Sequence, residues 1–434
     1  MVDDIKDILH KGFDEFRQWV NPLIAQRAAM AGEPVQLLSA HGGPPLDDQG
    51  RPVEDMHGTQ VLGHRNPAIT AALQEFLKSD SLNWYPSRVN PFAGRLARRL
   101  CERTGYSNAY FGMSGSDGVE AAVKLARAAT RKPRVLAMTG AYHGCGLGST
   151  ALMTPGPFKD MFGPHLPGAE TLPLNDVDAL HRAMRSADVA CVVVEPIQVE
   201  GGVRTLSAEY VEALGTLTQQ HGALLIADEV QTGLGRSGHF LMSATWPRKA
   251  DVVVLAKMLG GGIVPVSAML THRAIFEQAY GANFQAGEAH NCTFGFNGFT
   301  ATAALATLDL ITDDVIAGVV RKGAHFQRVL KDAQARCELL EDIRGQGLML
   351  GIQLKKLNHP WLTFEHVGLP DIVGRDTVAP VVCHRLYKRG FFAFSCGHDW
   401  SVLRLQPRFE IPDETLTVFA DVLAEEGNRL LRLQ

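Results

Sequence analysis

The chain reads Ala223-Leu224-Leu225-Ile226-Ala227-Asp228-Glu229 and, after a loop, Asp251-Val252-Val253-Val254-Leu255-Ala256-Lys257. Both stretches are short runs of apolar residues that end in a charge. Continuous apolar runs of this length, bounded by polar residues and glycines, are typical of strands that are covered on both faces, as in a parallel sheet. We therefore expect two buried, neighbouring strands of one parallel sheet.

A third apolar run, residues 190–194, ends in Glu195-Pro196. In an open α/β sheet, ligands bind outside the carboxyl ends of the strands. Because Glu195, Asp228 and Lys257 all lie at the carboxyl ends of predicted strands, we expect them to face one crevice.

Two interpretations of Asp228 and Lys257 are open. They could form a structural ion pair, which also perturbs pKa values. Alternatively, the lysine amine forms a Schiff base with pyridoxal phosphate (PLP), and the acidic residue pairs with the ring nitrogen of that cofactor. The second interpretation requires a phosphate-binding site elsewhere in the chain.

Ser114-Gly115-Ser116-Asp117 is a candidate for that site, because it lies between a short apolar strand and a helical pattern over 117–130. Small residues at a helix start let backbone N–H groups approach an anion, which the helix dipole favours. The alternative is an ordinary helix cap by one of the two serines. Gly118 sacrifices about 1 kcal/mol of helix propensity, and close approach of a ligand or of backbone is one explanation.

Two other motifs are misleading. Residues 233–238 match the dinucleotide pattern GxGxxG, but no strand ends directly before them and no helical pattern follows. The strand ending at Asp228-Glu229 resembles the acidic strand of an ATPase, yet the chain contains no GxxxxGK[ST] motif. We therefore expect neither a nicotinamide cofactor nor ATP hydrolysis.

Composition excludes further classes of protein. The net charge of −4 provides no basic field for a nucleic acid or a membrane surface. The seven cysteines form no CxxC pair and the 16 histidines show no ligand spacing, so we expect no disulfide framework and no metal site. An acidic N-terminus without a long apolar run predicts a soluble, cytoplasmic protein.

The organisation along the chain predicts an α/β protein with a mainly parallel, doubly wound sheet and right-handed crossovers. An amphipathic helix over 5–20, expected to dock on a neighbour, and a Gly- and Pro-rich stretch of turns and short antiparallel strands form the segment 1–65, part of the small lobe. The large domain covers 66–310. A smaller α+β domain covers 311–434, and we expect no continuous buried strand after Lys257.

Together these motifs resemble the class III aminotransferases, PLP enzymes of fold type I that include ornithine, acetylornithine and 4-aminobutyrate aminotransferases. The resemblance extends from about Val53 to Pro412. The motifs that carry it are Gly63-His64-Arg65-Asn66-Pro67, Ser114-Gly115-Ser116, Tyr142-His143-Gly144, Glu195-Pro196-Ile197-Gln198, residues 228–238, Lys257, Thr293-Phe294-Gly295 and Arg344-Gly345-Gln346-Gly347-Leu348.

The resemblance implies roles for the cofactor residues. Lys257 would hold PLP covalently and Asp228 would keep its ring nitrogen protonated, as the catalytic pair. Gly115 and Ser116 would bind the phosphate, with Thr293 of the partner subunit of a homodimer, whose active sites lie at the subunit interface. The remaining cofactor contacts would come from Tyr142 on the ring face, Gln231 at the ring hydroxyl, and His143 and Glu195 beside them.

The resemblance also implies substrate contacts. Arg404 would receive a substrate carboxylate, and Glu200 would be its removable partner. Trp84, Tyr85 and Arg88 would line the substrate mouth. Cys145 stands where ornithine and 4-aminobutyrate aminotransferases carry an arginine for a second carboxylate, which disfavours a substrate with two carboxylate contacts.

The implied activity is transfer of a terminal (ω) amine to a 2-oxo acid such as 2-oxoglutarate or pyruvate, in two half-reactions. An amino-acid racemase or aminomutase and a dialkylglycine-type decarboxylase share every cofactor residue, so they remain alternatives. A purely binding or regulatory role is disfavoured, because Lys257 and Asp228 are both present.

Overall fold

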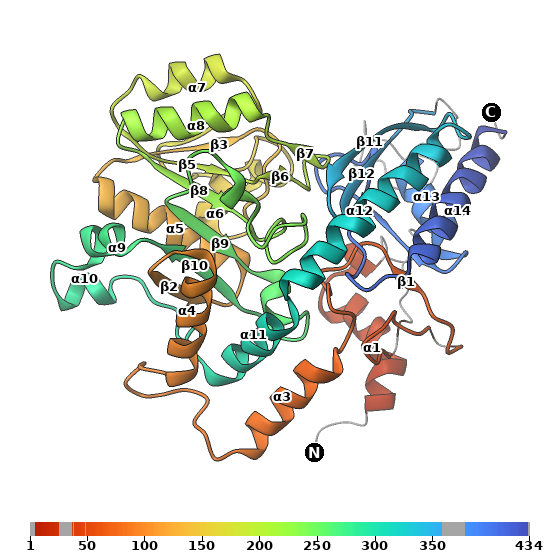
Figure 1. Cartoon of the computed structure of the whole chain (residues 1–434), viewed down its shortest axis with the longest axis horizontal. Coiled ribbons are helices and arrows are strands. Elements are labelled where there is room, and N and C mark those ends of the chain that lie inside the picture. The colour runs from red at the N-terminus through yellow and green to blue at the C-terminus, as the bar shows by residue number, and fades with distance from the viewer. Residues whose placement is uncertain (1–4, 26–36, 38, 48, 358–377, 433–434) are drawn as a thin grey trace.

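A computed structural model describes residues 5–25, 37, 39–47, 49–357 and 378–432 of the chain (Figure 1). A large sheet with helices on both faces occupies one side of the molecule, and a smaller sheet with its own helices occupies the other (Figure 1). The long helix α12 (Asp313–Gln334) runs from one to the other.

The large sheet has seven strands in the order β2-β10-β9-β8-β5-β3-β4. Neighbouring strands from β9 to β4 are parallel, whereas β10 is antiparallel to both β9 and β2. The strands are β2 (Asn108–Gly112), β3 (Arg134–Met138), β4 (Ala169–Leu172), β5 (Val189–Val194), β8 (Leu224–Asp228), β9 (Val252–Leu255) and β10 (Ser267–Thr271). The prediction of no buried strand after Lys257 is therefore wrong, because every residue of β10 is buried.

Helices cover both faces of this sheet. Alternation along β9 sends Val252 and Val254 into one core, with helix α5 (Gly115–Thr130), and Val253 and Leu255 into the other, with helix α8 (Ala208–Gln220). The remaining helices that surround it are α3 (Pro67–Lys78), α4 (Pro91–Thr104), α6 (Leu147–Ala151), α7 (Val177–Met184), α9 (Arg273–Tyr280), α10 (Phe284–Glu288) and α11 (Gly298–Leu310). The doubly wound architecture follows from strands that are apolar on both sides.

Gly118 serves this packing of helix on sheet. A Cβ atom at this position would lie 2.6 Å from the Cγ1 atom of Val254 on β9. Close approach of helix α5 to the sheet, not of a ligand, therefore explains the glycine.

The smaller sheet is antiparallel, in the order β11-β12-β15-β14. Its strands are β11 (Leu340–Gln346), β12 (Met349–Leu354), β14 (Phe394–Ser395) and β15 (Val402–Leu405), and helices α12, α13 (Val378–Tyr387) and α14 (Asp413–Leu431) accompany them. The division into segments at residues 65 and 310 stays a prediction.

The N-terminal part of the chain joins this side of the molecule. Strand β1 (Glu54–Asp55) pairs in parallel with β13 (Phe391–Phe392), so this strand is not antiparallel as expected; isolated antiparallel bridges precede it at Leu46. Arg408 donates to both carboxylate oxygens of Glu54, at 3.0 and 3.3 Å, which gives that arginine a structural role. Helix α1 (Ile5–Trp19) exposes Ile5 and Trp19.

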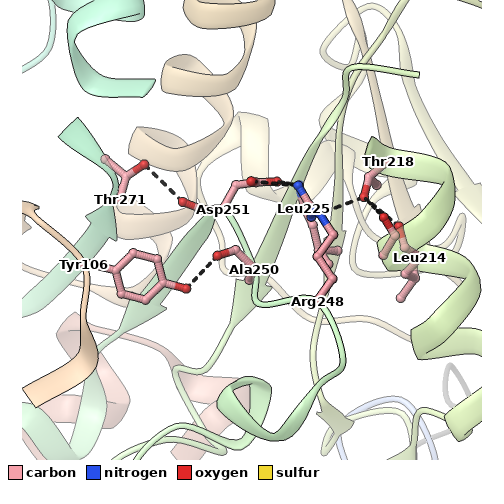
Figure 2. Close-up of polar contacts among 9 residues, drawn as sticks. Tyr106, Leu214, Thr218, Leu225, Arg248, Ala250, Asp251 and Thr271 are labelled. Atoms are coloured by element: carbon pink, nitrogen blue, oxygen red, sulfur yellow. Dashed lines mark hydrogen bonds and ion pairs between the residues drawn. The ribbon is translucent and has the colours of Figure 1, made fainter. Parts of the chain in front are cut away.

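A polar network closes the amino-terminal edge of the large sheet (Figure 2). Asp251, just before β9, accepts hydrogen bonds from Arg248 Nη2 at 2.8 and 2.9 Å and from Leu225 N at 2.7 Å. Tyr106 donates its hydroxyl to the Ala250 carbonyl at 2.7 Å. Arg248 also donates to Thr218 Oγ1, so the network links β8 and the residue before β9 to helix α8.

Candidate active site

A cavity of about 470 Å³ lies at the opposite, carboxyl edge of the large sheet. Its volume is in the range of small-molecule sites. It is lined by Gly115, Ser116, Tyr142, His143, Glu195, Asp228, Gln231 and Lys257, together with Ser114, Asp117, Gly144, Cys145, Gly146 and Val230. The structure thus brings together every predicted cofactor residue except Thr293.

Lys257 lies two residues after the end of β9 and begins a short 3₁₀ helix. Its φ of +46° lies in the left-handed region, which is unfavourable for a residue with a side chain and marks a site held in place by its surroundings. Burial lowers the pKa of the Lys257 amine, and Arg404 lowers it further, against the attraction of Glu200, Asp228 and Glu195. Among the described residues no hydrogen bond or ion pair engages this amine.

Asp228 ends β8 and is 4% exposed. Its Oδ1 accepts from Val230 N at 3.1 Å, and its Oδ2 contacts His143 Nδ1 at 2.7 Å. Burial alone would lower the pKa of His143, but the hydrogen bond and charge of Asp228 outweigh it and raise that pKa. The other ring nitrogen, Nε2, is buried without a partner, so His143 is oriented solely by the carboxylate.

Glu195 follows β5 and lies beside this pair. Its Oε1 accepts from Tyr142 N at 2.9 Å. Burial raises the pKa of Glu195 to about 8, against the opposing effect of His143. The protonated, neutral form of Glu195 is therefore favoured at neutral pH, which limits the negative charge around Asp228.

The N-terminus of α5 forms one wall of the cavity. Ser114 caps the helix: its hydroxyl accepts from Asp117 N, and the Asp117 carboxylate accepts from Ser114 N. The structure thus confirms the cap, and the cap leaves the N–H groups of Gly115 and Ser116 at the cavity wall. A Cβ atom on Gly144 would lie 2.5 Å from that of Ser116, so the glycine allows the two loops to approach.

Tyr142 and Gln231 connect the cavity to a second group of residues. The Tyr142 hydroxyl lies 3.0 Å from Cys145 Sγ. Gln231 donates from Nε2 to Glu200 Oε1 at 3.4 Å. Glu200 also accepts from Gly397 N at 2.8 Å and forms an ion pair with Arg404 Nη1.

One residue of this second group, His57, is not marked by any motif in the sequence. The Nη2 atom of Arg404 is hydrogen-bonded to Nε2 of His57, which precedes it by 347 residues. No local pattern marks His57, because its role depends on a contact between the two ends of the chain.

The remaining predicted residues lie outside the cavity of this chain. Trp84 donates from Nε1 to the carbonyl of Thr293 at 2.9 Å. Trp84, predicted at the substrate mouth, and Thr293, predicted at the phosphate, therefore lie side by side on the surface. Trp84, Arg88 and Thr293 are exposed, and Tyr85 is half-buried. Their predicted roles involve a second subunit or the substrate and stay predictions.

Comparison with known proteins identifies the family. The model of the family "Aminotransferase class-III" matches residues 33–425. The chain belongs to the class III aminotransferases. It is 32% identical over 375 residues to a putrescine aminotransferase of Pectobacterium atrosepticum, covering 82% of this chain and 79% of the relative. It is 34% identical over 327 residues to an acetylornithine aminotransferase of Methanopyrus kandleri, covering 74% and 81%.

Solved aminotransferase structures share the fold. The ornithine aminotransferase of Toxoplasma gondii superposes with a TM-score of 0.84 at 24% identity, covering 98% of this chain and 96% of that one. An amine transaminase from an uncultivated Pseudomonas species, in a PLP-bound form, gives a TM-score of 0.80 at 24% identity, covering 91% and 94%. The predicted family, fold and enzyme class are confirmed, and the family is PLP-dependent.

The donor set of the cavity suits an organic cofactor. The cavity offers an amine that none of the described residues engages, a buried carboxylate and the N-terminus of a 16-residue helix. These groups can engage an aldehyde, a ring nitrogen and a phosphate. Among the described residues no group of three or more His, Cys, Asp or Glu could hold a metal ion, and no helix is both long and apolar enough to span a membrane.

Proposed function

We propose that this class III aminotransferase moves a terminal amino group from an amine to a 2-oxo acid, in two half-reactions, as a homodimer. The observation that carries the proposal is the half-buried Lys257 side chain, which lines the cavity together with Asp228 and whose amine is engaged by none of the described residues. A structural ion pair would instead engage the lysine.

The residues present fit PLP. Lys257 would bind its aldehyde, Asp228 its ring nitrogen, and the N–H groups of Gly115 and Ser116 its phosphate, joined by Thr293 of the partner subunit. Tyr142 would cover the ring face and Gln231 would approach its hydroxyl. When bound, PLP supplies an aldehyde that captures amines and a ring that accepts electrons.

Lys257 would also move the proton. Its pKa is lowered by burial, so a larger fraction of the amine is neutral near pH 7 than for an exposed lysine. A neutral Nζ takes a proton from the amine-bearing carbon of the substrate, and proton transfer of this kind contributes about 10²–10⁴-fold to rate. The position of Lys257 at the start of a short 3₁₀ helix holds Nζ in the cavity.

Asp228 and His143 would act as a unit. The carboxylate supplies the negative charge that keeps a ring nitrogen protonated. The contact of 2.7 Å with His143 Nδ1 holds the carboxylate in one orientation. The neutral form of Glu195, favoured by its raised pKa, leaves Asp228 as the carboxylate whose negative charge would act on the ring nitrogen.

Glu200 and Arg404 would allow two different substrates to use one site. Paired with Glu200, Arg404 presents no net charge, which suits an amine without a carboxylate. When a 2-oxo acid arrives, its carboxylate replaces Glu200 on the guanidinium, and Gly397 N and Gln231 Nε2 remain as donors to Glu200. Bidentate binding of a carboxylate is the geometry that a guanidinium favours.

The relatives support an ω-amine as donor. The names of two of them include putrescine and acetylornithine, and the amine of putrescine is terminal. Cys145 lines the cavity and carries no charge at the position predicted to differ from ornithine aminotransferases, so a donor without a carboxylate on that side fits best.

The test is a titration of the visible spectrum of the purified protein with monoamines, diamines and amino acids, without any oxo acid. We expect the yellow colour of the bound cofactor to bleach with the true donor and to return on addition of 2-oxoglutarate or pyruvate. A protein that is yellow but never bleaches lastingly contradicts amino transfer, and a colourless protein that takes up no PLP contradicts the assignment of the cavity.

A further inference from the structure

Arg404 is held on two sides by partners of different kinds. Its Nη1 atom forms an ion pair with the Glu200 carboxylate, and its Nη2 atom is hydrogen-bonded to the Nε2 atom of His57. The third nitrogen, Nε, is buried without a partner. The arginine therefore has one charged and one uncharged partner.

The ring of His57 is fixed by its surroundings. It packs edge-on against Phe392, with ring centroids 5.9 Å apart, and tilted against Phe394 at 5.2 Å. The backbone N–H of His57 donates to Asp55 Oδ1 at 2.9 Å, and Asp55 Oδ2 contacts His64 Nε2 at 2.8 Å. These contacts hold both the ring and the backbone of His57, so its Nε2 atom is an oriented acceptor.

The contact with Arg404 determines which ring nitrogen of His57 carries the proton. A guanidinium has five N–H donors and no acceptor, so the His57 Nε2 atom that faces Arg404 must be unprotonated. Burial, followed by the charge of Arg404, lowers the pKa of His57 to about 3. His57 is therefore neutral, with its proton on Nδ1, and cancels none of the positive charge of Arg404.

We propose that His57 is a positioning residue, which holds Arg404 at the cavity while Glu200 and a substrate carboxylate exchange places on it. The inference rests on the proposed role of Arg404 as carboxylate receptor. An exchange at Nη1 leaves the guanidinium attached at Nη2, so Arg404 does not follow Glu200. A receptor that is already oriented loses less conformational entropy when its ligand binds.

A neutral acceptor suits this task better than a second carboxylate would. Two carboxylates on one guanidinium would leave an incoming acid to displace charge from both sides. With His57, the incoming acid displaces only Glu200, and the pair that it forms with Arg404 keeps its full Coulomb attraction.

The experiment uses the holoenzyme and three single variants. His57→Phe keeps a ring between Phe392 and Phe394 but removes the acceptor. His57→Gln restores an acceptor near the position of Nε2. His64→Gln is the matched control, because His64 contacts Asp55 and not Arg404. The probes are glutarate, which has carboxylates but no carbonyl, and an amine that lacks a carboxylate.

We expect His57→Phe to weaken glutarate binding by roughly 10- to 100-fold in calorimetry, as loss of a hydrogen bond to a charged group does. The KM of the oxo acid rises by a similar factor while kcat changes little. The rate of bleaching by the carboxylate-free amine stays at the wild-type value. His57→Gln recovers most of the affinity for glutarate, and His64→Gln retains it.

Three results overturn the inference: unchanged glutarate affinity in His57→Phe, an equal loss in His64→Gln, or a wild-type enzyme that does not bind glutarate. Failure of the proposed function is distinct, because the wild-type enzyme would then transfer no amino group at all. A wild-type enzyme that transfers amino groups while His57→Phe binds glutarate normally refutes only the role of His57.

Discussion

The charged residues at the two ends of strand β9 differ in their hydrogen bonding. At the amino end, Asp251 accepts three side-chain or backbone contacts and lies in a network in which Arg248 and Tyr106 also have partners (Figure 2). At the carboxyl end, Lys257 follows the strand by two residues, its side chain is half-buried, and its amine is engaged by none of the described residues.

This difference in hydrogen bonding indicates that the amino end of β9 contributes to stability and the carboxyl end to catalysis. Polar groups that satisfy one another stabilise a fold, whereas a group left short of partners adds no such stability. Charged groups without a protein partner in a cleft are typical of functional sites. The comparison predicts that substitutions at the carboxyl end reduce activity with little loss of stability, and that substitutions at the amino end do the reverse.

Lys257→Ala is expected to have the largest effect. Turnover should fall by about 10²–10⁴-fold or more, because the variant lacks the amine that moves the proton. Without added cofactor, its free energy of unfolding should equal or exceed that of the wild type, since the amine that is removed has no partner among the described residues and burial lowers its pKa. Initial rates with the identified donor and urea denaturation measure the two quantities. An unchanged visible spectrum and unchanged turnover would contradict the assignment.

Asp228→Asn is expected to have the next largest effect. Asparagine keeps the shape of the side chain and a contact with His143 but removes the charge, so turnover should fall by about 10²–10³-fold. The matched control is Asp251→Asn, at the other end of the sheet, which should retain the turnover of the folded wild type. Equal losses in the two variants would show that the carboxylates do not differ in role.

Asp251→Ala should affect stability instead. Arg248 and the Leu225 N–H lose their acceptor, and we expect the free energy of unfolding to fall by about 1–3 kcal/mol. The turnover of the remaining folded protein should be unchanged. Denaturant unfolding, with activity expressed per folded molecule, measures both. A loss of activity as large as that of Asp228→Asn would contradict the expectation that the amino end of β9 contributes to stability and not to activity.

Glu195→Gln should change the dependence of stability on pH. The pKa of Glu195 is raised by burial from 4.5 to about 8, so the fold favours the protonated form. That contribution is complete below the unfolded value and is lost as pH rises through the folded value. Relative to Glu195→Gln, the wild type should lose roughly 1.4 kcal/mol of unfolding free energy per pH unit within this window.

Denaturation of both proteins at several pH values, in the absence of cofactor, tests this expectation. Parallel stability curves for wild type and Glu195→Gln would show that the carboxyl group titrates normally.

Local pattern was sufficient for much of the fold. The apolar runs before Glu195, Asp228 and Lys257 form β5, β8 and β9 as expected, and the helical spacing over 413–431 forms α14. The same rule missed β10, because Ser267 and Thr271 interrupt its apolar run. These polar residues are buried because β10 lies between β2 and β9, and the sequence of β10 alone does not contain that information.

The site divides in the same way. Residues that follow strand ends, such as Asp228 and Lys257, could be placed from the chain, because parallel strands bring their carboxyl ends to one edge. His57 could not be placed from the chain, because its role depends on its contact with Arg404. The two residues are adjacent only after the N-terminal segment pairs with β13. For Gly118 the sequence predicts close approach of a ligand or of backbone, whereas the Val254 side chain is the group that lies against it.

The sequence by itself determined the parallel sheet, the charges at its edge and, through motifs in order, membership of the class III aminotransferases. Hydrophobic periodicity and strand-end position are local properties, so they can be read without a structure. Only the tertiary structure decided which charges have partners. Whether Lys257 is left without one, and whether Arg404 has a neutral as well as a charged one, depends on atoms hundreds of residues apart that meet within hydrogen-bond distance.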